Sequence, residues 1–204
     1  MNQQGDNCFI FDVVNSLVEQ GYKLSKSIQA ELLPEAKQYH GAIFSLNGKK
    51  CVYRKGKVTA DRPGAFLALW KRPNLVSGSN KPIPLIEEDI DYLFIKVEEH
   101  YTVNQEGSVV AQDHLLIDKP KVGLFIFPVK LLLEKGFIAS FKYKGKTGFR
   151  VFPPWSGNRG NHATKVFSES GKKTQVWQLP YFVEIDENGA LDISTFNQIT
   201  KCFS

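Results

Sequence analysis

The sequence has few cysteines and no long apolar run, and each shortage excludes a class of protein. Its three cysteines, Cys8, Cys51 and Cys202, lie far apart and are odd in number, so we expect no disulfide framework. Neither they nor the four scattered histidines show the spacing of a zinc site. A run of about 18 apolar residues, the minimum for a membrane span, does not occur. The first residues also lack the basic segment and apolar core of a signal peptide. We therefore expect a reduced, cytoplasmic protein with no membrane partner.

Sequence signatures of well-known enzymes are missing as well. The chain contains no P-loop, no GxGxxG, GxSxG or HExxH motif, no calcium-binding loop and no internal repeat. Hydrophobic residues make up 42% and charged residues 23%, which is typical of a globular protein. A length of 204 residues fits one domain. We therefore predict a single domain over residues 1–204, and we favour a monomer.

Positive charge is present in modest excess, and its distribution is more informative than the formal net charge of +5. Residues 49–72 contain eight lysines and arginines against one acidic residue, and residues 142–173 repeat this ratio. Between them, residues 87–118 contain nine acidic residues against a single lysine. If the two basic blocks meet on one face, they form the electrostatic footprint of a polyanion-binding protein.

The apolar pattern predicts an α+β protein with a central mixed β-sheet flanked by helices. Asn47-Gly48 between two apolar runs is typical of a tight hairpin turn. We expect helices over residues 9–21, 27–33, 128–138 and 193–203. We expect strands over residues 42–46, 49–54, 65–70, 91–97, 122–128, 148–152 and 178–185, with a long loop over 153–173.

Several motifs, in order, resemble the MepB-like family, a bacterial group. The matching residues include Phe44-Ser45-Leu46-Asn47-Gly48, Arg54-Lys55-Gly56-Lys57-Val58-Thr59, Leu69-Trp70-Lys71-Arg72, Gly123-Leu124-Phe125-Ile126-Phe127-Pro128, Arg150-Val151-Phe152-Pro153-Pro154-Trp155 and Lys173-Thr174-Gln175-Val176-Trp177-Gln178. On this resemblance, residues 35–185 form the family core and residues 1–34 a helical N-terminal segment. The resemblance implies a restriction-endonuclease-like fold and, from it, a DNA-binding role, which must still be argued from the site.

A nuclease of that fold needs carboxylates to hold Mg²⁺ beside a lysine, usually as an (Asp/Glu)-x-Lys triplet. The candidate triplet here is Lys55-Gly56-Lys57, in which a lysine stands where the acid should be. Glu35 and Asp91 are the remaining candidate carboxylates, and catalysis would require both to meet Lys57. We therefore expect no metal or cofactor, with Mg²⁺ reserved for the nuclease alternative.

Lys57 and Thr59 are two residues apart on a strand and therefore face the same side, which suits contact with a phosphate. Trp155, in a loop rich in Pro and Gly, suits either base stacking or the core. Arg54 and Lys55 could instead pair with acidic residues inside the molecule. The full predicted nucleic-acid-binding set is Arg54, Lys55, Lys57, Thr59, Lys71, Arg72, Lys146, Arg150, Trp155 and Arg159.

These observations predict a nucleic-acid-binding protein, with DNA as the partner, on a catalytically degenerate restriction-endonuclease-like fold. We favour a binding protein over an enzyme because the triplet lacks its acid. Two alternatives remain open. One is a Mg²⁺-dependent nuclease that uses Glu35, Asp91 and Lys57, and the other is a protein- or small-ligand-binding module.

Overall fold

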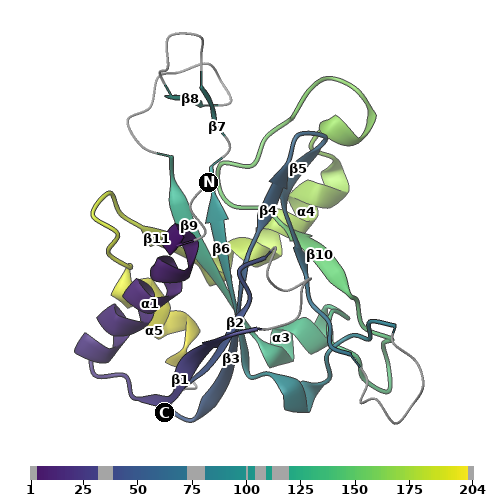
Figure 1. Ribbon diagram of the computed structural model, residues 1–204. Helices are drawn as coiled ribbons and strands as arrows, with labels where there is room; N and C mark the ends of the chain where they lie inside the picture. Colours follow the sequence, from purple (N-terminus) through teal and green to yellow (C-terminus); the bar gives the residue numbers. More distant parts are fainter. Residues whose placement is uncertain are drawn as a thin grey trace.

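The computed structural model describes residues 4–31, 39–72, 81–99, 101–103, 109–111 and 120–201. Its helices are α1 (Gln4–Glu19), α3 (Val129–Glu134), α4 (Glu169–Gln178) and α5 (Ile193–Ile199), with 3-10 turns η2 (Glu87–Asp89), η3 (Ala163–Lys165) and η4 (Leu179–Tyr181). Its strands are β1 (Leu24–Ala30), β2 (Ala42–Leu46), β3 (Lys49–Lys55), β4 (Lys57–Thr59), β5 (Arg62–Ala68), β6 (Tyr92–Glu98), β7 (Tyr101–Val103), β8 (Val109–Ala111), β9 (Val122–Pro128), β10 (Gly148–Val151) and β11 (Phe182–Ile185). Figure 1 shows their arrangement.

A six-stranded sheet with the order β1-β2-β3-β6-β9-β11 forms the centre of the described structure. Strands β3 and β6 run parallel, and the other pairs are antiparallel. Helices α1 and α5 lie on one side of this sheet, and α3 and α4 lie on the other (Figure 1). The predicted α+β class, with a central mixed sheet flanked by helices, is therefore confirmed, and the layout is compatible with a restriction-endonuclease-like fold.

Successive side chains of the central strands point to opposite faces of the sheet, so the core has two layers. Phe94 of β6 packs in a layer with Val14 of α1 and Phe196 of α5. Leu93, its neighbour in the strand, packs on the opposite side with Leu132 of α3. All five side chains are fully buried. The nearly continuous apolar runs of β6 and β9 follow from this burial on both faces.

The hairpin predicted at Asn47-Gly48 is confirmed. Asn47 and Gly48 both have positive φ, 47° and 77°, which a two-residue turn of this kind requires. The turn joins β2 to β3 with Leu46 paired to Lys49. The turn chemistry therefore sets the register of the strand that carries the first basic block.

A three-stranded sheet with the order β10-β5-β4 covers the α3 side of the central sheet. The chain enters it through Gly56, whose N–H donates to the Lys96 carbonyl over 2.8 Å. A Cβ at Gly56 would lie 2.9 Å from that of Ala65, so only glycine permits this approach without displacement. The small sheet buries Leu67 and Phe149 against the central one.

Two predicted elements were wrong. Residues 27–33 were expected to form a helix, but β1 extends over Leu24–Ala30 and pairs with β2. Residues 153–173 were expected to form a loop throughout, but α4 begins at Glu169, and the Ser168 side chain caps it by accepting from the Gly171 N–H. Helix α4 lacks a clear apolar stripe, so no periodicity indicated it.

None of the helices in the described part of the chain is long and apolar enough to cross a membrane.

Candidate anion-binding site

The two basic blocks of the sequence meet in the small sheet. Strands β4 and β5 belong to the first block, and β10 belongs to the second. Lys57 pairs with Phe66, and Phe66 pairs with Arg150. Side chains directly opposite one another project from the same face of a sheet. Since the alternating residues Leu67 and Phe149 are buried, Lys57, Phe66 and Arg150 lie on the outer face.

Arg150 is held in a fixed position on this face. Its Nη2 donates to the Thr59 hydroxyl over 2.9 Å, and its Nη1 donates to the carbonyls of Pro63 and Gly64 over 3.2 and 3.5 Å. The guanidinium carbon lies 5.9 Å from the centroid of the Phe66 ring. These partners orient the side chain without neutralising it, because none of them carries a charge.

Arg159, in the loop that follows β10, also has a guanidinium group without a charged partner among the described residues. In the part of the chain that the structure describes, the Nε and Nη1 groups of Arg159 are buried and have no hydrogen-bond partner, and the same holds for the Ser156 hydroxyl. Buried polar groups in native proteins almost always have a partner. Each missing hydrogen bond costs about 1–3 kcal/mol, and more for a charged group. Three such atoms occur within four residues, and an acceptor oxygen from outside the chain could satisfy the two Arg159 donors.

The loop that carries Arg159 is itself well anchored. The Arg159 N–H donates to the Lys165 carbonyl over 2.7 Å, and the Asn158 side chain accepts from the Phe167 N–H over 2.7 Å. Phe167 is buried and stacks on Phe152, which follows β10 directly. The unpaired guanidinium groups are therefore part of an ordered loop.

Like charges surround both arginines. Burial lowers the pKa of Arg159, and the positive charge of Arg150 lowers it further. Burial likewise lowers the pKa of Arg150, as does Arg62, while Asp61 acts in the opposite sense. A lowered arginine pKa means that the charged form is poorly compensated, although guanidinium stays protonated at neutral pH. A bound anion would relieve both the burial and the repulsion.

Asp61 is the carboxylate that acts on the charge of Arg150, but it compensates that charge only in part. Its pKa lies below the usual range mainly because the Thr59 hydroxyl donates to it, with Arg62 and Arg150 adding smaller effects. The side chain is exposed to solvent. Thr59 thus links Arg150 to Asp61, and the cluster keeps an excess of positive charge.

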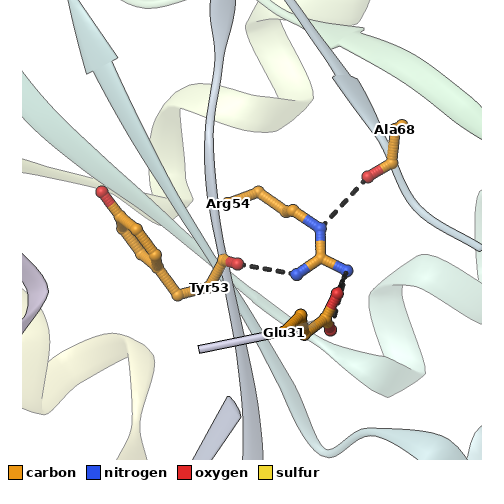
Figure 2. A network of polar contacts seen from close by, with 4 residues as sticks. All are labelled: Glu31, Tyr53, Arg54 and Ala68. Atoms are coloured by element: carbon orange, nitrogen blue, oxygen red, sulfur yellow. Dashed lines mark hydrogen bonds and ion pairs between the residues drawn. The ribbon is translucent and has the colours of Figure 1, made fainter. Parts of the chain in front are cut away.

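Arg54, predicted to bind nucleic acid, has a structural role instead (Figure 2). Its Nη2 contacts both carboxylate oxygens of Glu31 at 3.0 and 2.8 Å, and its Nε and Nη1 donate to the carbonyls of Ala68 and Tyr53. The residue is only 3% exposed, so a phosphate could not reach it. The prediction for Arg54 is therefore corrected, and the internal pairing proposed as the other possibility is the observed one.

Three further predicted residues have internal partners. Lys55 Nζ lies 3.1 Å from a carboxylate oxygen of Glu98, and Lys71 Nζ lies 2.6 Å from one of Asp89. The half-buried Trp155 packs edge-on against Phe182, with 5.5 Å between ring centroids. Each of the three therefore already has a partner inside the molecule.

The remaining predicted binding residues differ in the contacts that their side chains make. Lys57 is exposed on the outer face of the small sheet. Lys146 is exposed too, with Nζ 4.4 Å from the centroid of Phe137. The guanidinium of Arg72 lies 5.3 Å from the Trp70 ring centroid.

Of the predicted catalytic residues, Glu35 lies outside the described residues, and the structure does not bring Asp91 and Lys57 together. Asp91 Oδ2 accepts from the Lys50 N–H over 2.7 Å, which places it level with the start of β3. Lys57 follows Gly56, which bonds to Lys96, five residues further along β6 and about 16 Å away at the usual rise per residue. Within the described part of the chain, no three His, Cys, Asp or Glu side chains are grouped so that they could hold a metal ion.

Sequence reasoning missed Arg62, Asp61 and Ser156. Arg62 and Asp61 were missed because the start of β5 was misplaced. It was expected at Ala65, but the strand begins at Arg62. With the correct start, Thr59 and Arg62 pair across a two-residue turn, and this cross-strand pair would have indicated the cluster. No local pattern marks Ser156, because its burial depends on contacts made by the whole loop.

Two comparisons with known proteins place this chain among relatives. A family model described as MepB-like matches residues 34–120 and 109–184, well over half of the chain. A solved structure titled "Crystal Structure of MepB" is 25% identical, with a TM-score of 0.58, and the match covers 86% of this chain and 97% of the other. No curated protein sequence matches.

Proposed function

The chain belongs to the MepB-like family, and we propose that it binds DNA through the phosphate backbone. The binding surface consists of the outer face of the small sheet together with the loop over residues 153–160. One observation carries the proposal. Arg150 and Arg159 repel each other, are partly buried, and have no carboxylate within ion-pair distance in the described structure.

The chemistry of guanidinium explains why phosphate is the favoured ligand. Arginine offers planar, forked donors that match phosphate oxygens, and such charge-assisted hydrogen bonds are about twice as strong as neutral ones. Lys57 lies on the same face and adds a flexible point charge. A phosphate would satisfy the unpaired donors of Arg159 and offset the repulsion from Arg150. In the DNA-free protein, the unpaired donors and the repulsion both raise the free energy of the folded state.

A binding role is favoured over hydrolysis by the positions of the acids. Asp91 lies at the far end of β6 from Lys57, where its carboxylate accepts from the Lys50 N–H. A two-strand nuclease centre needs its carboxylates and lysine within a few ångströms. We therefore propose a catalytically degenerate member of a restriction-endonuclease-like fold.

The alternative of a small-ligand-binding module has one observation in its favour. A groove of about 1010 Å³ lies between α1, the start of β9 and the segment that joins β11 to α5. Its lining includes five acids against two lysines, namely Asp12, Glu184, Asp186, Glu187 and Asp192 against Lys96 and Lys121. This acidic character suits a cationic ligand and opposes DNA, so the groove and the basic face would serve different partners.

Fluorescence anisotropy with a labelled duplex of about 25 base pairs tests the DNA-binding proposal. Affinity should fall linearly with the logarithm of salt concentration, because each neutralised phosphate releases counterions. Arg159→Gln removes the charge and the forked donors but keeps a polar side chain, and it should weaken binding at least tenfold. Lys26→Gln on the exposed edge strand β1 is the matched control and should bind as the wild type does.

Two results would overturn the proposal. One is the absence of duplex binding at low salt, and the other is an Arg159→Gln protein that binds as tightly as the Lys26→Gln control. Incubation of plasmid with the wild type and Mg²⁺ or Mn²⁺ addresses the nuclease alternative. Cleavage that disappears in Asp91→Ala would favour that alternative over binding alone.

A further inference from the structure

Phe141 is fully exposed to solvent, which sets it apart from the other large apolar side chains of the described structure. It lies in residues 139–147, the part of the α3–β10 connection that precedes β10, which we call the Phe141 loop. Because β10 begins at Gly148, paired with Ala68 at the end of β5, the loop lies at one end of the small sheet. Thr59 and Arg62 lie at the other end.

The Phe141 loop is ordered by hydrogen bonds on both sides of its tip. The Ser140 N–H donates to the Tyr143 carbonyl over 2.8 Å, and the Ser140 hydroxyl accepts from the N–H groups of Lys142 and Tyr143. At its base, the Ala139 N–H donates to the Leu85 carbonyl over 2.8 Å. The backbone therefore presents the Phe141 ring to water in a defined position.

Three lysines lie in the same loop as this ring. Lys142, Lys144 and Lys146 are exposed in the same loop, and the half-exposed Tyr143 packs beside Gly136. A partner that covers Phe141 must therefore offer both an apolar or aromatic surface and negative charge. A nucleobase beside its phosphates meets both requirements, since base faces stack on aromatic side chains while lysines contact the backbone.

The position of the loop relative to the arginines fits a single stretch of DNA. Phe141 precedes Arg150 by nine residues, so their Cα atoms are at most about 32 Å apart. That is less than one turn of B-DNA, about 34 Å. One turn of a duplex whose phosphates contact Arg150 is therefore long enough to span the distance to the Phe141 loop.

We propose that Phe141 stacks on a nucleobase of the DNA held by Arg150 and Arg159, as an aromatic wedge at one end of the binding surface. This inference rests on the proposed DNA-binding function. The base face is available in a single strand, or at a duplex step that the wedge partly unstacks and bends. An anionic lipid surface is the less favoured partner, because durable interfacial binding needs a larger apolar area than one ring supplies.

The test uses the full chain and DNA labelled with 2-aminopurine, whose fluorescence reports base stacking. Phe141→Ala should weaken binding about tenfold and abolish the fluorescence change, because base–aromatic stacking is lost. Phe141→Trp should retain both. The salt dependence of binding should be the same in all three proteins, because the phosphate contacts remain. Phe11→Ala, a partly exposed phenylalanine on α1 across the central sheet, is the matched control.

Parallel titrations of duplex and single-stranded probes identify which source supplies the base, and a fluorescence change in either one supports the inference. If the wild type binds DNA with the expected salt dependence but Phe141→Ala behaves as Phe11→Ala does, the wedge is wrong and the DNA-binding proposal stands. If the wild type binds no DNA, both fail. Loss of binding to anionic lipid vesicles in Phe141→Ala, with DNA binding unchanged, would overturn the wedge in favour of a lipid surface.

Discussion

Arg54 and Arg159 both have buried guanidinium nitrogens, but their positive charges are compensated to different degrees. Arg54 contacts both carboxylate oxygens of Glu31 and two backbone carbonyls, so each of its nitrogens has a partner. Arg159 has two buried nitrogens without a partner in the described structure, and Arg150 repels it. The two arginines belong to different basic blocks of the sequence. Their comparison shows that the fold supplies a counterion to Arg54 and, among the described residues, none to the buried nitrogens of Arg159.

The same contrast extends to the lysines. Lys96 is almost completely buried on the central sheet, and its Nζ lies 2.6 Å from Glu98, which also pairs with Lys55. Lys57, just beyond the end of β3, is exposed on the small sheet. Lys96 of the central sheet therefore has an internal counterion, whereas Lys57 of the small sheet is exposed to solvent.

The largest expected effect is on Arg54. Arg54→Met should lower the free energy of unfolding by about 3 kcal/mol, because it removes one partner of a largely buried pair and leaves Glu31 uncompensated. Urea denaturation measures this change. The double variant Glu31→Leu with Arg54→Met should regain part of the loss, since no unpaired charge remains. An equal loss in the single and double variants would show that packing, not charge, explains the effect.

The same substitution at Arg159 should act in the opposite direction. Arg159→Met should raise the free energy of unfolding by about 1 kcal/mol, because it removes buried donors that have no partner. Comparison of urea denaturation curves with those of Arg54→Met gives the sign directly. Added duplex DNA should stabilise the wild type but have much less effect on this variant. A destabilised Arg159→Met protein would indicate that Arg159 has a structural role, as Arg54 does.

A smaller effect should appear in the pH dependence of stability. Burial alone would raise the pKa of Glu98, but Lys96 and Lys55 outweigh it, so the folded-state pKa lies below the unfolded one. The stability from Glu98 is therefore complete above the unfolded pKa, about 4.3, and is lost as pH falls through the lower folded value. Glu98→Gln should flatten the decline in unfolding free energy below about pH 4.5. Exposed Glu134→Gln is the control and should follow the wild-type profile.

Local patterns were sufficient for the hairpin and for the buried strands. Asn47-Gly48 predicted the turn because few residue pairs tolerate positive φ at both positions. The apolar runs of β6 and β9 predicted strands because both of their faces are buried. Residues 27–33 were mispredicted because their spacing suits a helix, whereas pairing of Leu24–Ala30 with β2 overrides that preference. Helix α4 depends on tertiary contacts too, since its Trp177 packs against Phe127 and Phe137.

By itself, the sequence determined the α+β class, the turn between β2 and β3, and the separation of charge into blocks. These follow from short-range chemistry: backbone preferences, alternation of apolar residues and local charge. Only the tertiary structure decided which cations are neutralised. Glu31 reaches Arg54 from 23 residues away, and Thr59 contacts Arg150 from 91 residues away. Since charge compensation acts over distance in space and not along the chain, the roles of Arg54 and Arg159 could be distinguished only once the chain had folded.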